Sequence, residues 1–374
     1  MHISAKPWNG DLVMKHIELH PEDYLPAAPP QEIVQHYGIA IVGCGNIARN
    51  THLSAYYKFG YRVVAACDVI EEKAQTVAEE YNIPFWTTNI EAIIDRRDVD
   101  IVDLAVRPAD RLAAVEQLAP VGKHILSQKP LAPTLAEAER IVEVCEEAGV
   151  TLMINQQARW APYHTAMKVL IDRGCLGHLY SVLHVHRQFQ DSSDSKWLTT
   201  PDFTIIDNGI HYVDLSRYFT GRTPRWVKTT TTHVPGQNAT DPMIYTILCE
   251  YEPADLMSTL HFNNIAPALH HSPYLWHIDG TDASASIARY GPLRDGRTEL
   301  TISFKEDPDQ RQVFHIHGSW FPDAWGGTMG EMQRALAAGV EPQVSGRDNL
   351  NSIRITNAAV ESSKTGQTIE IPPQ

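Results

Sequence analysis

The segment VGCGNIA, residues 42–48, constrains the fold of this chain more than any other feature, because it joins a glycine turn to the start of a helix. The apolar run 39–42 predicts a short buried strand directly before the turn. Gly43 and Gly45 allow a tight turn whose backbone N–H groups can approach a pyrophosphate closely. Ala48 stands where a small side chain lets helix and strand pack together. The segment therefore predicts a nucleotide-binding turn.

A second predicted strand, 62–67, leads to Asp68, which lies 20 residues past Ala48. That spacing fits the acid that binds the adenosine ribose in a dinucleotide-binding fold. A helix that begins near Asn46 would also direct its unpaired N–H groups at the phosphates. The Asp68 carboxylate would repel a 2′-phosphate, and the next two residues are apolar and add no cation. The sequence therefore favours NAD over NADP as the cofactor.

Length and charge set outer limits on the class of protein. A chain of 374 residues is too long for one typical core and suits two domains. The net charge of −14 opposes a phosphate backbone, so we expect no nucleic acid partner. The five scattered cysteines form no CxxC pair, which argues against a disulfide framework or a thiolate zinc site and favours a reducing cytoplasm. No apolar run reaches the length of a membrane span, and the first 30 residues lack the pattern of a signal peptide, so we expect a cytoplasmic protein with no membrane partner.

The order of the predicted elements divides the chain into three parts. Residues 1–36 are rich in proline and form an N-terminal extension, either a partly disordered tail or an arm that packs on a neighbouring subunit or on the second domain. Over 37–158 strands and helices alternate, which predicts an α/β domain with a doubly wound parallel sheet, and the capping box TLAE opens its last helix. Over 159–374 runs of strands predict a second, largely antiparallel domain that closes with two helices and a short strand.

A lysine followed by proline, Lys129 and Pro130, stands just after the predicted strand 124–126. Ligands of parallel sheets bind beyond the carboxyl ends of the strands. Because Pro130 restricts the preceding residue to extended conformations, the ammonium would be held on a defined backbone and could bond a ribose or substrate hydroxyl. Taken alone, the pair is better explained as an ordinary surface lysine beside a turn.

The segment 204–221 places a carboxylate and an imidazole four residues apart, at Asp207 and His211. On a helix that ends at Gly221, these two side chains share one face. Oxidation of an alcohol requires a group that accepts the hydroxyl proton, and histidine suits that task near neutral pH. The alternative is a structural pair, with Asp207 as the helix cap and His211 as a half-buried packing residue.

The glycine turn with Asp68, the lysine-proline pair and the DxGxH pattern at 207–211 together resemble the glucose-fructose oxidoreductase and inositol dehydrogenase family, Gfo/Idh/MocA, from about residue 37 to the end. The resemblance implies an N-terminal Rossmann domain, a C-terminal α/β domain with an open, mostly antiparallel sheet, and a homo-oligomer, dimer or tetramer. It also implies carbohydrate metabolism, with a sugar or cyclitol as substrate. In that family Lys129 would contact substrate and nicotinamide ribose, His211 would act as acid or base, and Asp207 would assist.

Three segments depart from the family pattern or extend it. Gln128 stands where the family has glutamate, and Arg107 adds a cation after the strand 101–106, near the expected nicotinamide ribose. Gln157 and Arg159 lie in a stretch that resembles the family's interdomain linker and could reach nicotinamide or substrate, or could simply be polar residues at a helix entry.

The predicted site residues have catalytic, cofactor-binding or substrate-binding roles. The catalytic residues are Lys129, Asp207 and His211. The cofactor-binding residues are Gly43, Gly45, Asn46, Ile47, Asp68, Arg107, Gln128, Lys129 and Gln157. The substrate-binding residues are Lys129, Arg159, Asn208 and His211. No metal is expected, and His184 and His186, which alternate on one strand, are interpreted as a polar sheet surface.

The predicted function is transfer of a hydride between nicotinamide and a secondary alcohol of a sugar, sugar acid or cyclitol, by an NAD(P)-dependent dehydrogenase. Trp320 and Trp325 offer flat faces that suit the C–H surface of a sugar, although core packing explains at least one of them. Two other classes stay open. One is a hydrolase or lyase that uses tightly bound NAD for transient oxidation, and the other is a non-enzymatic sensor of NAD or sugar.

Overall fold

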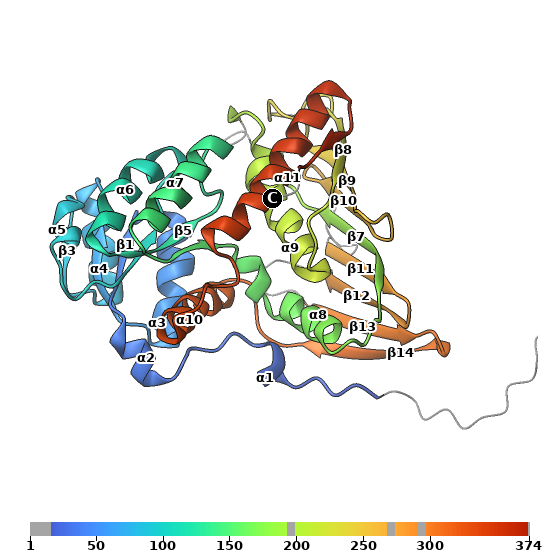
Figure 1. Cartoon of the computed structure of the whole chain (residues 1–374), viewed down its shortest axis with the longest axis horizontal. Coiled ribbons are helices and arrows are strands. Elements are labelled where there is room, and N and C mark those ends of the chain that lie inside the picture. Colours follow the sequence, from blue (N-terminus) through green and yellow to red (C-terminus); the bar gives the residue numbers. More distant parts are fainter. Residues whose placement is uncertain (1–15, 193–198, 268–273, 291–296, 373–374) are drawn as a thin grey trace, which may run out of the picture.

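Two β-sheets organise the molecule, each in its own domain (Figure 1). The computed structural model describes residues 16–192, 199–267, 274–290 and 297–372. The first sheet has six parallel strands in the order β3-β2-β1-β4-β5-β6. Its strands are β1 Ile39–Val42, β2 Val63–Cys67, β3 Trp86–Thr87, β4 Ile101–Leu104, β5 His124–Gln128 and β6 Leu152–Asn155. The predicted doubly wound sheet is confirmed, and its strand order reverses between β1 and β4, where such sheets leave a crevice for ligands.

Helices cover both faces of the first sheet. They are the π-helical segment η1 Ala48–Leu53, α3 Ser54–Phe59, α4 Glu71–Tyr81, α5 Glu91–Ile94, α6 Arg111–Leu118 and α7 Leu135–Glu147, with short 3₁₀ turns η2 Pro108–Asp110 and η3 Ala119–Val121. At the start of α7 the Thr134 hydroxyl accepts the Glu137 N–H at 3.2 Å and donates to the Glu137 carboxylate at 2.8 Å. This geometry confirms the helix start predicted from TLAE.

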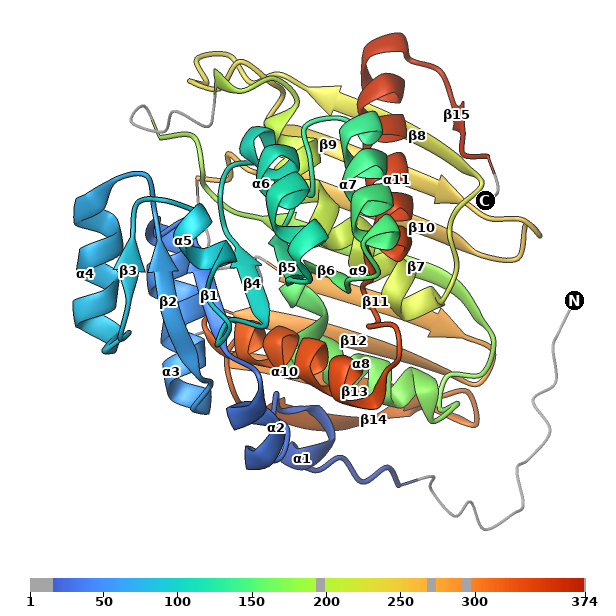
Figure 2. The same cartoon turned by 60° about the vertical axis from the view of Figure 1, so that its left-hand side comes forward.

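The second sheet has nine strands in the order β14-β13-β12-β11-β7-β10-β9-β8-β15. Its strands are β7 Leu179–Arg187, β8 Trp226–Thr232, β9 Ile244–Glu250, β10 Met257–Asn263, β11 Tyr274–Gly280, β12 Ala283–Tyr290, β13 Arg297–Phe304, β14 Asp307–Ile316 and β15 Ile369–Glu370. All neighbours are antiparallel except β7 and β10. Helices α8 Pro162–Asp172, α9 Ile210–Thr220 and α11 Gly346–Thr365 pack on one face of this sheet (Figure 2). The prediction of a mostly antiparallel second sheet is confirmed.

Two histidines of β7 lie on the covered face of this sheet. His184 is fully buried, and its ring stacks on Tyr212 of α9 and on Trp276 of β11, with centroid distances of 4.4 and 4.2 Å. His186 is also buried, and burial lowers its pKa to about 4. The interpretation of these two residues as a polar sheet surface is therefore wrong, because helices cover the face onto which they project.

The N-terminal arm, residues 16–36, crosses the second domain before the chain enters β1. Its first helix, α1 Pro21–Tyr24, packs on α8, and Asp23 pairs with Arg173 at 2.7 Å. Its second helix, α2 Gln31–His36, contacts α10 Asp323–Ala338. The described part of the extension is thus an arm on the second domain, whereas residues 1–15 lie outside the described residues.

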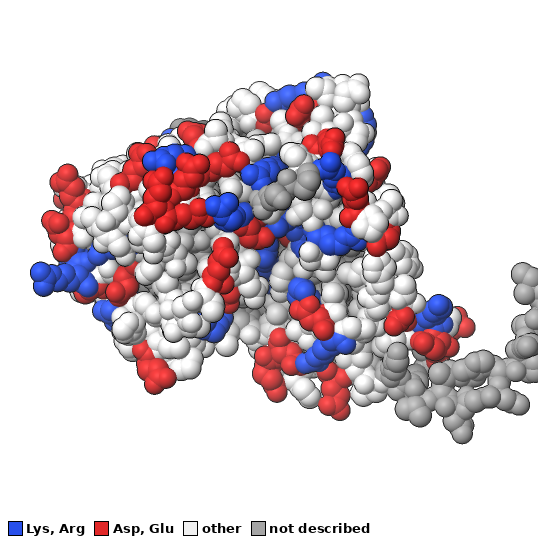
Figure 3. Space-filling model, in the orientation of Figure 1, with Lys and Arg blue, Asp and Glu red and all other residues white. Residues whose placement is uncertain are grey.

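The surface charge is uneven. Acidic side chains gather over α7, whose exposed positions include Glu143, Glu146 and Glu147 (Figure 3). Such a face repels a phosphate backbone, in keeping with the net charge of −14. In the described ranges no helix is both long and apolar enough to span a lipid bilayer.

Candidate active site

The predicted dinucleotide turn connects β1 to a helix that begins at Asn46. Gly43 has a φ of 94°, and a Cβ added there would lie 2.8 Å from the Ala105 carbonyl carbon, so only glycine fits. A Cβ added at Gly45 would meet no atom within 4 Å, so the outer side of the turn is open. Asn46 and Ile47 are exposed at the start of the helix. The turn therefore offers free space beside helical N–H groups, which fits a pyrophosphate.

Asp68 directly follows β2 beside this turn, and backbone N–H groups hold its carboxylate in place. One oxygen accepts the Cys44 N–H and the other accepts the Ile70 N–H, each at 2.8 Å. Because each carboxylate oxygen has two lone pairs, both can still accept a ribose hydroxyl. Val69 and Ile70 are 88% and 46% exposed, which leaves apolar surface where an adenine ring can pack. The residues present fit a dinucleotide.

An ion pair between the two domains brings two predicted catalytic residues together. Lys129 follows β5, and its Nζ lies 3.0 Å from Oδ1 of Asp207 and donates to the Asp207 carbonyl at 2.8 Å. Asp207 lies in a π-helical segment, η6 Thr204–Gly209, that leads into α9. Asp207 does not cap α9, because Gly209 occupies the N-cap position of that helix. The interpretation of Asp207 as the helix cap is therefore wrong. The helix ends before Gly221, which has a φ of 66°, as predicted.

His211, in the first turn of α9, is 9% exposed. Its ring meets the indole of Trp320 edge-to-face at 5.8 Å. Burial lowers the His211 pKa well below its usual value, and the charge of Lys129 lowers it further, as do His164 and His186. Its Nδ1 is enclosed and has no hydrogen-bond partner in the described chain. An unpaired buried nitrogen costs folding free energy, and the role of His211 as acid or base stays a prediction.

Three further predicted residues differ in whether their polar groups already have hydrogen-bond partners. Gln128 is engaged at both ends of its amide, by the Lys129 N–H at 2.8 Å and by His52 Nε2 at 3.0 Å, which favours a positioning role over a cofactor contact. Gln157 begins the 3₁₀ turn η4 Gln157–Trp160, and its buried Oε1 has no partner in the described residues, so it stays a candidate for cofactor binding. Arg107 is exposed beyond β4 and remains a prediction.

The guanidinium of Arg159 is enclosed in an ion-pair network. It meets the Asp214 carboxylate with two N–O distances of 2.7 and 2.8 Å, and Asp348 of α11 at 3.2 Å. Arg217 of α9 pairs with the same Asp348 at 2.7 Å. This arrangement favours a structural role for Arg159, between η4, α9 and α11, over the predicted substrate contact.

A cluster of side-chain amides near Asp207 was not predicted in full. Asn208 donates to Oδ1 of Asn264 at 3.2 Å, and Gln188 donates to the same oxygen at 2.8 Å. Gln188 and Asn264 follow β7 and β10, the parallel pair of the second sheet, so their strands end side by side. Only Asn208 had been predicted, since nothing in the local sequence shows that strands some 75 residues apart become neighbours.

Both tryptophans of the segment 317–327 are buried. Trp320 is 3% exposed and Trp325 is 1% exposed, and neither indole N–H has a partner in the described residues. Trp320 contacts His211, whereas Trp325 lies 6.1 Å from the ring of His52. Trp320 is therefore the better candidate for contact with a substrate.

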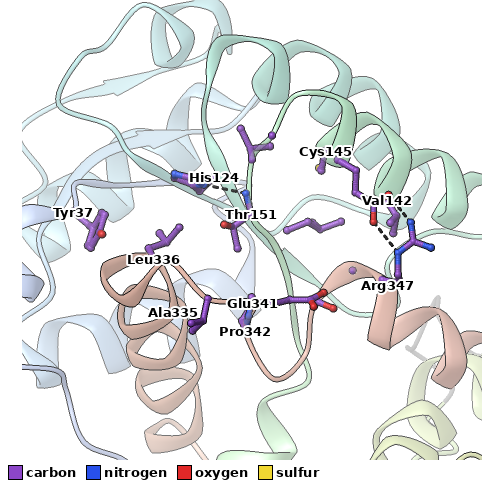
Figure 4. Close-up of a pocket in the computed structure, with 18 residues that line it drawn as sticks. Tyr37, His124, Val142, Cys145, Thr151, Ala335, Leu336, Glu341, Pro342 and Arg347 are labelled. Carbon is purple, nitrogen blue, oxygen red and sulfur yellow. Dashed lines mark hydrogen bonds and ion pairs between the residues drawn. The ribbon is translucent and has the colours of Figure 1, made fainter.

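A cavity of about 470 Å³ lies at the opposite edge of the first sheet (Figure 4). His124 and Thr151, near the amino ends of β5 and β6, line it together with the end of α10. Lys129 follows the carboxyl end of β5, so this cavity is separate from the candidate active site.

Comparison with known proteins places the whole arrangement in one family. A model described as an oxidoreductase family with an NAD-binding Rossmann fold matches residues 37–156, and a model of the Gfo/Idh/MocA C-terminal domain matches residues 164–286. The chain belongs to the Gfo/Idh/MocA family. It is therefore an oxidoreductase of the dehydrogenase type, and the resemblance inferred from its motifs is confirmed.

Two relatives and one solved structure match this family member over nearly their full length. A D-apiose dehydrogenase from Paraburkholderia graminis is 28% identical over 90% of each chain. A D-xylose 1-dehydrogenase (NADP⁺) from Haloferax volcanii is 24% identical over 88% of this chain and 98% of its own. An oxidoreductase from Agrobacterium radiobacter, solved with NAD⁺, L-tartaric acid and magnesium, has a TM-score of 0.76 at 23% identity and covers 90% of this chain and 98% of its own. The last likeness shows the shared fold.

Proposed function

We propose that this family member oxidises a secondary alcohol of a sugar, sugar acid or cyclitol with NAD as its cofactor. The observation that carries the proposal is the 3.0 Å ion pair between Lys129 and Asp207, which come from different domains. The buried His211 lies four residues after Asp207. When bound, NAD supplies the acceptor for the hydride of the alcohol carbon. Lys129 and Asp207 would hold substrate hydroxyls, and His211 would accept the hydroxyl proton. The dehydrogenases of D-apiose and D-xylose among its relatives support this substrate class.

The proposal is tested by supplying NAD with a panel of pentoses, hexoses, sugar acids and inositols. We expect absorbance of reduced nicotinamide at about 340 nm with at least one of them. Binding of NAD without turnover on the whole panel would contradict the proposal and favour a sensor. Purification with tightly bound NAD that is never reduced overall would instead favour a hydrolase or lyase.

The burial of His211 predicts an unusual pH dependence of oxidation. A base must be neutral to accept a proton, and the pKa of His211 lies well below the usual value of about 6.5, chiefly because of burial. A lowered pKa keeps the imidazole neutral to lower pH. We therefore expect the acid limb of the kcat/KM profile to have its midpoint below pH 6.5. Rates measured between about pH 4.5 and 9, within the stable range of the enzyme, check this expectation. A limb at or above pH 6.5 would contradict it.

Asp68 is expected to set the preference for NAD over NADP. Its carboxylate is fixed beside the turn by two backbone N–H groups and would repel a 2′-phosphate. Lys73, in the first turn of α4, is close enough to lower the pKa of Cys44, so a cation lies within electrostatic reach of the same turn. Exchange of Asp68 for serine is therefore expected to raise kcat/KM with NADP relative to NAD by about tenfold or more.

The matched control for this exchange carries a second substitution, Lys73→Met. If Lys73 takes up the 2′-phosphate once Asp68 is gone, the double variant loses the gain with NADP that the single variant shows. Steady-state rates with both cofactors at one substrate concentration measure the ratio. An unchanged ratio in the Asp68→Ser variant would show that another group sets the preference.

A further inference from the structure

A buried chain of hydrogen bonds runs from the helix after the dinucleotide turn to Lys129. His52 lies in η1, and its Nδ1 is 2.6 Å from Oδ2 of Asp103 in β4. The Tyr56 hydroxyl donates to the same oxygen at 2.6 Å. On its other side, His52 Nε2 lies 3.0 Å from Nε2 of Gln128, whose Oε1 accepts the Lys129 N–H at 2.8 Å. The side chains of His52, Asp103 and Tyr56 are fully buried.

The direction of each hydrogen bond in this chain follows from the bond at the Lys129 end, where the donor is known. A backbone N–H only donates, so the Gln128 oxygen must face the Lys129 N–H, and the amide NH₂ must face His52. His52 Nε2 then accepts and carries no proton, which places the ring proton on Nδ1, where it donates to Asp103. Asp103 thus fixes the tautomer of His52, and His52 fixes the orientation of the Gln128 amide. A glutamate at position 128 has no N–H to offer His52.

We propose that His52 is a positioning residue for Lys129 and acts on it through Gln128. The Gln128 amide holds the backbone N–H of Lys129 at the point where the chain leaves β5. Because η1 continues the helix that begins at the dinucleotide turn, the same bonds tie that helix to Lys129. The inference rests on the proposed role of Lys129 in holding substrate, and it assigns a task to a glutamine that stands where the family has glutamate.

Two exchanges of His52, each of which keeps one of its two hydrogen bonds, separate a positioning role from a packing role. In His52→Gln the side-chain amide reaches the place of Nε2 and can accept from Gln128, whereas in His52→Asn it reaches only the place of Nδ1 and keeps the bond to Asp103. We expect kcat within about threefold of wild type for His52→Gln and a loss of about tenfold or more for His52→Asn. The Kd for NAD, measured by titration, should stay within about threefold in both variants. Equal losses of kcat in the two variants would overturn the proposal.

A spectroscopic measurement tests the bond directions without any substrate. In ¹⁵N-histidine-labelled protein, the His52 signals, assigned by their absence in His52→Gln, are expected to show the neutral ring protonated at Nδ1. In Gln128→Glu, the side chain has no N–H to donate to Nε2, and we expect the signal of that nitrogen to shift. A ring protonated at Nε2 in the wild type would overturn the proposal even if no substrate were known. Failure of every polyol to be oxidised, with the Nδ1 tautomer present, would instead count against the proposed function.

Discussion

Exchange of His211 for asparagine is expected to lower kcat for alcohol oxidation by about 10²- to 10⁴-fold, the usual contribution of a positioned general base. The proton must leave the hydroxyl as the carbon is oxidised, and His211 is the imidazole whose pKa is lowered by the charge of Lys129 as well as by burial. Asparagine accepts hydrogen bonds but takes no proton near neutral pH. Initial rates at saturating substrate and NAD measure the loss.

Two controls separate lost chemistry from lost structure in this variant. The Kd for NAD should change little, because the turn, Asp68 and the exposed residues around them belong to the first domain. Exchange of His178 for asparagine should leave kcat unchanged, since this side chain is 58% exposed and precedes β7 at the end away from His186. A His211→Asn variant with kcat within tenfold of wild type and a normal thermal midpoint would show that another group accepts the proton.

The fold of the first domain could be predicted closely because residues close together in the sequence determine its strands and helices. The strand 39–42 matches the structure at both ends, and the capping box correctly marks the start of α7. In such a domain each strand is followed by the helix that covers it, so periodicity and turn residues near one another in the chain decide the fold. The π-helical turns η1 and η6 were not predicted, since no local sequence pattern distinguishes them from an ordinary helix.

The second domain was predicted less completely, because its sheet depends on distant pairings. Runs of strands were predicted there without their order, and the parallel pairing of β7 with β10 joins segments that the local pattern cannot relate. The roles of the site residues show the same limit. The roles of Lys129, Asp207 and His211 stay predictions, and the partners of Arg159 and Gln128 come from α9, α11 and η1, which the local sequence does not indicate. Those tertiary contacts decide which polar atoms already have hydrogen-bond or ion-pair partners.

Exchange of Asp214 for asparagine is expected to lower the free energy of unfolding by about 3–5 kcal/mol, the usual effect of removing one member of a buried ion pair. Asp214 is fully buried and accepts two bonds from Arg159 and one from Ser352 at 3.0 Å. Asparagine keeps the volume but loses the charge, so the buried guanidinium of Arg159 loses its main counterion. Urea unfolding at one fixed protein concentration measures the change, because oligomer formation would make the midpoint depend on concentration.

The controls for this variant use a surface pair and an apolar replacement of the buried pair. Asp172→Asn removes the partner of Lys168 on α8, a carboxylate that is 59% exposed, and should change the midpoint little. Replacing Arg159 with methionine and Asp214 with leucine together should recover much of the lost stability, since no unpaired charge remains. If Asp214→Asn unfolds like the wild type, Arg159 does not depend on this carboxylate, and its predicted substrate contact gains support. Because α9 carries both Asp214 and His211, a real loosening of the network should also lower kcat, which links the stability of this junction to the placement of the base.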